Sequence, residues 1–164
     1  VTVSGLLDLI VLWTHLFAAI IFVGGSFFIW LVVWPASYEI ANTEAQRSTI
    51  VGRIAKRFAY FTHASIAILI ASGVYLAAPY LQSPALISTT SGGQLLSTKV
   101  VVVIIMIVLM YTNNVYHGRK IMRLIAEAKL DELRRVRKLT HLASFITLGL
   151  LVIITLLGVA LVSS

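Results

Sequence analysis

The chain contains no cysteine and few charged residues. Without cysteine it can form no disulfide, no thiolate metal site and no covalent c-type haem attachment. Asp, Glu, Lys and Arg make up 12% of its residues, against about 25% in a typical soluble domain. No serine has a base at a recognisable spacing, which excludes catalytic triads. Hydrophobic residues account for 59% of the chain, and this composition predicts an integral membrane protein.

Long apolar runs dominate the sequence, and four of them reach the length of about 20 residues that a helix needs to cross a bilayer. They show no two-residue alternation, so they predict helices and not the strands of a barrel. The predicted helices cover residues 6–34, 58–80, 96–117 with an extension to about 128, and 132–162, and the first ends before Pro35. The sequence therefore predicts an all-α fold, an antiparallel four-helix bundle that forms a single transmembrane domain over residues 1–164.

Basic residues are concentrated in two connections between the predicted helices. Residues 36–57 hold four of them and residues 118–138 hold eight, so twelve of the thirteen Lys and Arg lie there. The connection over residues 81–94 carries no charge. The positive-inside rule places both basic connections in the cytoplasm and both termini outside, in a multi-pass protein of a prokaryotic cytoplasmic membrane. Because orientation explains most of the net charge of +7, we expect no binding to nucleic acid.

The second basic connection is more than a loop. Residues 123–139 contain strong helix formers and no glycine or proline, so the third and fourth helices are predicted to extend out of the membrane as a hairpin. We expect this hairpin to be solvated and to attract anionic lipid headgroups. The alternative is a docking surface for a partner protein.

Six ionisable residues lie within the predicted spans, and such residues are candidates for a functional site by default. They are Asp8, His15, His63, Lys99, His117 and His141. With a helix rise of about 1.5 Å per residue, three of the histidines lie near the cytoplasmic face, and His15 stands apart. Asp8 and Lys99 both lie near the outer face. We expect Lys99 to point inward, to Asp8 or to a ligand carboxylate.

The inner histidines favour a b-type haem. In an up-down bundle the second and fourth helices run in the same direction, so His63 and His141 would face one another at similar depth. Basic residues that would hold the haem propionates follow just beyond them: Arg53, Lys56, Arg57 and Lys138. This arrangement predicts a low-spin haem b with His63 and His141 as iron ligands. His15 then serves a second haem or a quinone site.

Two other metals suit the same residues. Zinc would need three or four clustered ligands, and only His63, His117 and His141 would offer them. Copper accepts thioethers and imidazoles, so Met106, Met110 and His117 form a soft path for it. These three residues fall on one face of the predicted third helix, together with Lys99 and Asn113. The candidate metal ligands are therefore His15, His63, His117 and His141.

Two segments resemble a known family. THLFAAIIFVGGSFF, followed by WPA, resembles the first helix of the copper resistance protein D (CopD) membrane family, where a histidine precedes a Gly-Gly pair by nine residues. LLSTKVVVVIIMIVLM resembles the third helix of that family, where a lysine opens an apolar run. The same pattern occurs in the related HemJ-type protoporphyrinogen oxidases, small four-helix membrane proteins that bind haem b.

The resemblance implies a role for two residues. His15 would be a haem ligand or a redox-site residue, and Lys99 would hold a carboxylate. Phe22 and Val23 stand where the HemJ-type pattern has Trp-Phe, and this chain adds His63 and His141. These departures favour a plainer haem-binding role over porphyrinogen oxidation.

The sequence thus predicts a membrane-embedded b-type haem protein that transfers electrons, with one or two haem b groups and with quinone or a redox protein as partner. Three alternatives stay open: a HemJ-type protoporphyrinogen oxidase, which would make it an oxidoreductase; a CopD-type copper transport protein; and a cofactor-free structural subunit of a membrane complex. We expect contact with membrane lipid, and assembly as a homo-oligomer or as a subunit of a membrane complex.

Overall fold

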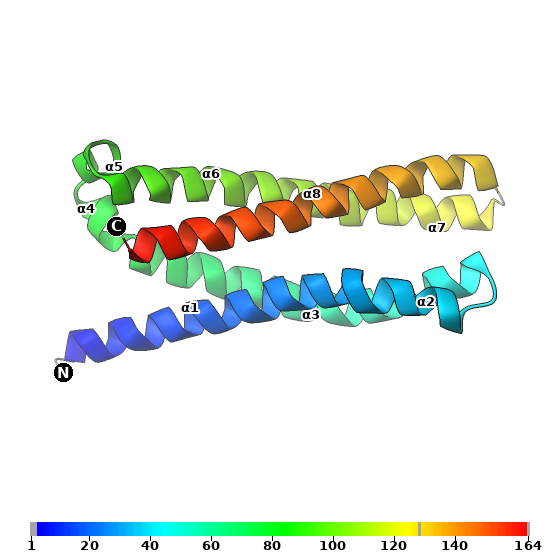
Figure 1. The fold of residues 1–164 in the computed structure, drawn as a ribbon, viewed down its shortest axis with the longest axis horizontal. Coiled ribbons are helices and arrows are strands. Elements are labelled where there is room, and N and C mark those ends of the chain that lie inside the picture. Colours follow the sequence, from blue (N-terminus) through cyan, green and yellow to red (C-terminus); the bar gives the residue numbers. More distant parts are fainter. Residues whose placement is uncertain (1–2, 128, 164) are drawn as a thin grey trace. The chain divides into compact units, whose positions relative to one another are not determined.

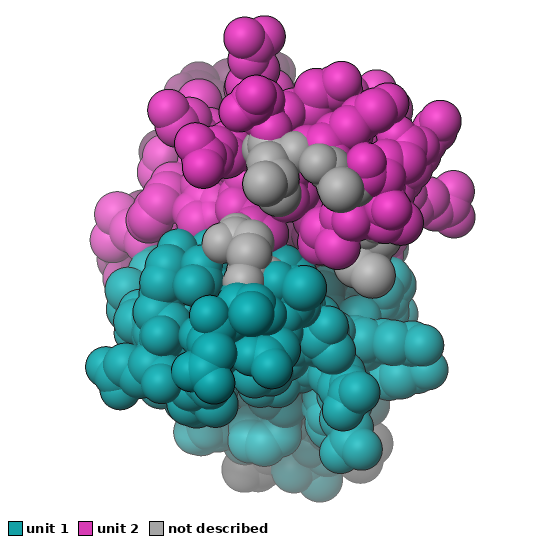
Figure 2. Space-filling view, turned by 90° about the vertical axis from the view of Figure 1, so that its right-hand side faces the viewer, with its two compact units in different colours: residues 1–82 teal, residues 83–164 magenta. Residues whose placement is uncertain are grey.

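The computed structural model describes residues 3–127 and 129–163, and every element in these ranges is helical (Figure 1). The chain divides into two compact units, residues 1–82 and residues 83–164, which Figure 2 shows in different colours. Each unit is built around one pair of long helices that run in opposite directions. The four long helices are α1 (Val3–Phe28), α3 (Glu44–Leu76), α6 (Ser91–Tyr111) and α8 (Leu130–Val162).

The first long helix continues past Pro35. α1 passes into a π-helical turn, η1 (Ile29–Val33), and the chain goes on as α2 (Trp34–Ile40). Proline has no backbone N–H, and its ring clashes with the carbonyl of the preceding turn of an α-helix. In the wider π turn the Trp34 N–H bonds to the Ile29 carbonyl, and Pro35 then occupies the first turn of α2, where no N–H is required. The predicted end before Pro35 is therefore wrong.

α3 begins well before the predicted start at residue 58. Thr43 caps it, because its Oγ1 accepts a hydrogen bond from the Gln46 N–H at 3.2 Å. Gln46 Oε1 in turn accepts a hydrogen bond from the Asn42 N–H at 3.1 Å. These bonds satisfy donors at the start of the helix. The sequence prediction followed hydropathy, which marks the part of a helix inside the membrane, and so it missed the basic turns of α3 that precede the apolar run.

A glycine brings α1 and α3 close together. A Cβ on Gly25 would overlap the ring of Phe58, whereas a Cβ on Gly24 would meet nothing within 4 Å. Ala18 and Phe22 of the same helix are buried. Within the Gly-Gly pair, Gly25 is therefore the residue that permits the close approach.

In the second unit, α6 begins five residues before its predicted start. It follows the short helices α4 (Ala78–Gln82), which belongs to the first unit, and α5 (Ala85–Thr89). Thr90 caps α6 by accepting a hydrogen bond from the Gly93 N–H at 3.0 Å. A Cβ on Gly93 would overlap the backbone of Leu86 and Ile87, so a side chain at this position would push α5 off α6.

The basic hairpin predicted after residue 117 is present. α6 continues through a second π turn, η2 (Thr112–His117), into α7 (Gly118–Ala126), and α8 returns beside it. Leu124, Leu133 and Val136 form a small buried core between the two helices. At the tip of the hairpin, the Glu127 carboxylate pairs with Arg123 at 2.6 Å and with Lys129 at 2.9 Å. Hydrogen bonds from these two cations lower the pKa of Glu127 to about 2.

Four helical stretches of the described residues are long and apolar enough to cross a membrane: Gly5–Ile40, Ala45–Leu76, Ser91–Ala126 and Asp131–Leu161. The two longest, Gly5–Ile40 and Ser91–Ala126, have 36 residues each. At about 1.5 Å per residue each of them spans about 54 Å, more than a hydrocarbon core of about 30 Å. Large apolar side chains such as Phe17, Ile20 and Leu156 are exposed on these helices, as lipid contact requires. The predicted fold class, an all-α membrane protein with four spanning helices, is confirmed.

Candidate functional site

His15 lies half-buried on α1 and contacts α3. Its Nδ1 is 2.8 Å from Ser72 Oγ, and the Ser72 hydroxyl donates to the carbonyl of Ile68. Because the Ser72 proton is directed to Ile68, Ser72 Oγ accepts a hydrogen bond and His15 Nδ1–H donates it. In the tautomer that donates from Nδ1 the lone pair is on Nε2, a nitrogen that can bind a metal ion.

Asp8 and Tyr75 form a second polar contact between α1 and α3. The Tyr75 hydroxyl donates to Asp8 Oδ1 at 2.9 Å. Asp8 lies about two helical turns from His15, and Tyr75 lies about one turn from Ser72. The two contacts therefore follow one line along the helix pair, the α1–α3 seam (Asp8, His15, Ser72 and Tyr75). It joins a carboxylate, an imidazole and two hydroxyls near the predicted outer end.

Lys99 lies half-buried on α6 and leans over α8. A Cβ on Gly158 would be 3.1 Å from Lys99 Nζ, so the glycine leaves room for the ammonium group. Lys99 thus points to its neighbouring helix. Its predicted partner Asp8 belongs to the other unit, and that pair stays a prediction.

Asn113 connects α6 to α8 farther along the same pair. Its Nδ2 donates to the Thr140 carbonyl at 3.3 Å and to Ser144 Oγ at 3.0 Å. Its Oδ1 accepts a hydrogen bond from His117 Nδ1–H at 2.9 Å. Both the nitrogen and the oxygen of the Asn113 amide therefore form hydrogen bonds. In the tautomer of His117 that donates from Nδ1, the lone pair is on Nε2. Asn113 and His117 both lie in the π turn η2, and such turns are frequent at functional sites.

Two methionines continue this line into the membrane. Met106 is 3% exposed and Met110 is 9% exposed, and Asn113 is 6% exposed. The five residues predicted to share one face of the third helix form the α6–α8 seam: Lys99, Met106, Met110, Asn113 and His117. The seam combines soft thioethers with an oriented imidazole.

The residues predicted to hold an inner haem lie in different units. His63 is exposed on α3, and its Nδ1 bonds to the Ala59 carbonyl of its own helix. His141 is half-buried on α8, next to the Thr140 carbonyl that Asn113 contacts. Arg57, predicted to bind a propionate, is exposed on α3. The pairing of His63 with His141 stays a prediction.

Within residues 3–127 and 129–163, no three His, Cys, Asp or Glu side chains come together as a metal site. The zinc alternative, which needed His63, His117 and His141 as a cluster, therefore finds no support. This result does not concern a site that binds metal through methionine thioethers, because methionine is not among these four residue types.

The sequence prediction missed Ser72 and Tyr75. Both lie in an apolar run that predicts an ordinary transmembrane helix. A serine or tyrosine in such a helix does not by itself indicate a functional site. Only their contacts with His15 and Asp8 on another helix identify them.

The fold and the two seams define a multi-pass helical membrane protein with polar and thioether side chains between its spans. Residues 52–162 match the family described as copper resistance protein D, and the chain belongs to that family. The predicted resemblance to the copper resistance protein D family is thereby confirmed. The match contains the whole α6–α8 seam and begins after His15. No curated protein matches the chain, and no solved structure matches it.

Proposed function

We propose that this protein moves copper through the membrane, with Cu(I) as its substrate and the α6–α8 seam as its route. Two findings support the proposal: the membership of the chain in the copper resistance protein D family, and the buried methionines that precede His117 on α6. Cu(I) is a soft ion that prefers thioether and imidazole ligands over carboxylates.

The observation that carries the proposal is the hydrogen bond between Asn113 Oδ1 and His117 Nδ1. Metal-binding histidines almost always donate their other ring N–H to an oxygen acceptor, which sets the tautomer and the ring orientation. Asn113 does this for His117, and its own amide group is held by α8. His117 is thus prepared to bind an ion through Nε2.

The spacing of the donors suits stepwise transfer. A rise of about 1.5 Å per residue places Met106 about 6 Å from Met110 along the helix axis, and His117 about 10 Å beyond it. An ion would pass from one donor to the next. At the other end, the Lys99 ammonium would repel a bare cation, so copper would enter there together with an anionic ligand.

Competition for Cu(I) with a chelator such as bathocuproine disulfonate tests this function on the full chain in detergent. We expect Asn113→Ala to weaken Cu(I) binding roughly ten-fold or more, the usual effect of removing a partner of a metal-binding histidine. Met106→Leu, Met110→Leu and His117→Ala remove donors and should weaken it as well. Asn114→Ala is the matched control, because Asn114 is the exposed neighbour of Asn113.

X-ray absorption spectroscopy of the copper-loaded protein identifies the atoms that coordinate the copper ion. Sulfur scatterers should be present in the wild type and absent when both methionines are replaced by leucine. The proposal fails if Asn113→Ala and Asn114→Ala bind Cu(I) equally well, or if the sulfur signal survives the double replacement.

A second candidate function keeps haem b and electron transfer, with quinone or a redox protein as partner. The observation that favours it is the His15–Ser72 hydrogen bond, which orients an imidazole with its lone pair on Nε2, as an axial haem ligand requires. The visible spectrum of the purified, reduced protein decides this candidate. A Soret band with sharp α and β bands that disappears in His15→Ala would support it, and a colourless protein that binds copper would reject it.

A further inference from the structure

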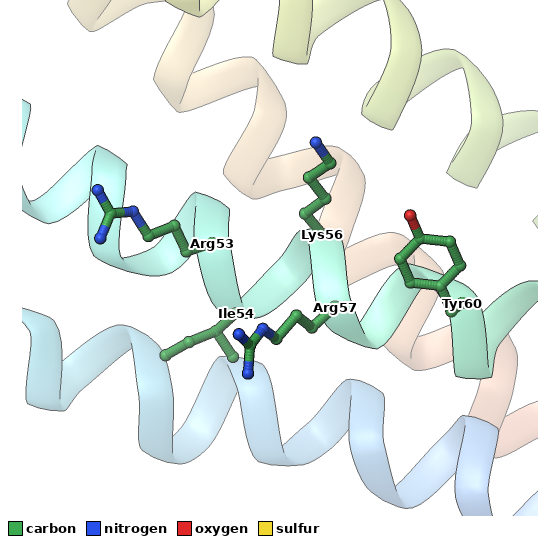
Figure 3. A pocket seen from close by; sticks show the side chains of 5 residues that line it. All are labelled: Arg53, Ile54, Lys56, Arg57 and Tyr60. Carbon is green, nitrogen blue, oxygen red and sulfur yellow. The ribbon is translucent and has the colours of Figure 1, made fainter.

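The cytoplasmic half of α3 carries a row of basic residues that the proposed copper route does not use. Arg53, Lys56, Arg57 and Tyr60 follow one another at i, i+3, i+4 and i+7, which places them on one side of the helix. Together with Ile54 they line a hollow of about 460 Å³ (Figure 3). In Figure 3 the Lys56 amine and the Tyr60 hydroxyl point the same way, whereas the Arg57 guanidinium is directed to the other side of the helix, beside Ile54. We call these four residues the α3 basic stripe.

The charges of the stripe lack acidic partners among the described residues. Arg53, Lys56 and Arg57 are all exposed, and none of them forms an ion pair with a carboxylate that the structure describes. No Asp or Glu occurs between residues 45 and 76. Like charges three or four residues apart on a helix destabilise it. An anion bound across the stripe would remove this repulsion.

The hairpin at the other basic connection provides a contrast. There Glu127 pairs with both Arg123 and Lys129, so part of the positive charge is neutralised within the chain. The stripe on α3 has no equivalent acid, although it belongs to the other predicted cytoplasmic connection. Within its own unit, no described carboxylate pairs with the stripe.

The stripe lies where basic charge gives way to apolar helix. Tyr60 is 73% exposed and directly precedes the apolar run that begins at Phe61. Tyrosine at such a boundary is typical of the membrane–water interface. Beyond Tyr60 the same side of α3 carries three small exposed residues, Ala64, Ala67 and Ala71. We call these three residues the alanine strip.

We propose that the α3 basic stripe binds an anionic phospholipid of the cytoplasmic leaflet. Lys56 holds the phosphate, and the exposed side chains of Arg53 and Arg57 turn to it on binding, since guanidinium and ammonium groups donate charge-assisted hydrogen bonds to phosphate oxygens. The Tyr60 hydroxyl donates to the same headgroup, and an acyl chain lies along the alanine strip. The occupant is a lipid and not free phosphate, because the strip continues the site into the apolar run.

Native mass spectrometry of the full chain tests the proposal, with dioleoyl phosphatidylglycerol, dioleoyl phosphatidylcholine or inorganic phosphate added to the detergent solution. The wild type should retain phosphatidylglycerol in preference to phosphatidylcholine. Arg53→Gln with Arg57→Gln should lower the retention of phosphatidylglycerol roughly twenty-five-fold, about five-fold for each charge removed near an anionic headgroup. The matched control, Arg134→Gln with Arg135→Gln, removes the same charge from two exposed positions on α8, outside the stripe, and should lower the retention clearly less than the α3 variant does.

A further variant keeps every charge and so avoids any effect on membrane orientation. Ala67→Leu fills the alanine strip and should lower the retention of the dioleoyl lipid. The proposal is overturned if the α8 control loses as much lipid as the α3 variant, if the wild type retains both lipids equally, if Ala67→Leu retains as much lipid as the wild type, or if inorganic phosphate displaces the lipid.

Discussion

The two helix pairs share an architecture and differ in chemistry. In the α1–α3 pair, the contacts between helices join oxygen and nitrogen groups: a tyrosine with an aspartate, and a histidine with a serine. In the α6–α8 pair, two buried methionines separate a lysine from an asparagine–histidine pair. The first pair therefore offers oxygen and imidazole groups near one end, and the second offers two thioethers and an imidazole along its length.

The two pairs also differ in how their helices approach. α1 and α3 come together where Gly25 leaves space for the ring of Phe58. α7 and α8 pack instead through Leu124, Leu133 and Val136 at the hairpin. The first unit thus has a glycine at the contact between its two long helices, whereas the hairpin of the second unit is held by aliphatic side chains.

The largest expected effect concerns the orientation of the chain in the membrane. Both basic connections predict the same orientation. Alkaline phosphatase is active only outside the cytoplasm. Fusions after Ser164 and after Ser83 should be active, and fusions after Arg57 and after Lys129 should be inactive, because the two basic connections are predicted to lie in the cytoplasm. Activity after Lys129 together with inactivity after Ser164 would reverse the predicted orientation.

Gly25→Ala should destabilise the first unit. A Cβ at Gly25 overlaps the Phe58 ring, and an overpacked contact of this kind typically costs about 1–3 kcal/mol. Thermal unfolding in detergent measures the loss. Gly24→Ala is the control and should be neutral or slightly stabilising, since a Cβ there meets nothing within 4 Å. Adding Phe58→Leu to Gly25→Ala should restore stability. If it does not, the Phe58 ring is not the cause of the destabilisation.

Ser72→Ala should have a smaller effect, on the α1–α3 seam alone. It removes the acceptor of His15 Nδ1–H, a loss of about 1 kcal/mol for one hydrogen bond. Nitrogen NMR of the labelled imidazole should show a smaller population of the Nδ1–H tautomer. Ser26→Ala serves as the control, because the Ser26 hydroxyl bonds to the Phe22 carbonyl of its own helix. Equal tautomer populations in the wild type, Ser72→Ala and Ser26→Ala would rule out the hydrogen bond between His15 and Ser72.

The smallest expected effect belongs to Glu127, at the tip of the exposed hairpin. Its pKa is about 2 in the folded chain, below the ordinary value of 4.5, so its ion pairs stabilise the hairpin above pH 4.5. As the pH falls from 4.5 to 2, this stabilisation is lost, because the unfolded chain takes up the proton first. The melting temperatures of the wild type and Glu127→Gln should therefore converge over this range. A difference that persists below pH 2, or that resists high salt, would contradict the ion-pair explanation.

The sequence predicted much of the fold and part of the candidate site. The four spans, the helical hairpin after residue 117 and the shared face of Met106, Met110 and Asn113 follow from apolar length and helical spacing, which are local properties. The rule that proline ends a helix failed at Pro35, because a π turn before it removed the clash. The start of α3 was missed because a polar helix that continues a span has no hydropathy signal of its own.

The sequence by itself determined that this is a membrane protein with four long helices, since burial in lipid depends on composition and length and not on which helix lies beside which. Only the tertiary structure decided which atoms meet. Ser72 as the acceptor of His15, Asn113 as the bridge between His117 and α8, and Gly25 instead of Gly24 as the contact glycine all depend on how each helix is rotated about its axis. A rotation of about 100° separates one residue from the next on a helix, and the spacing of residues in a sequence does not say which side faces the partner.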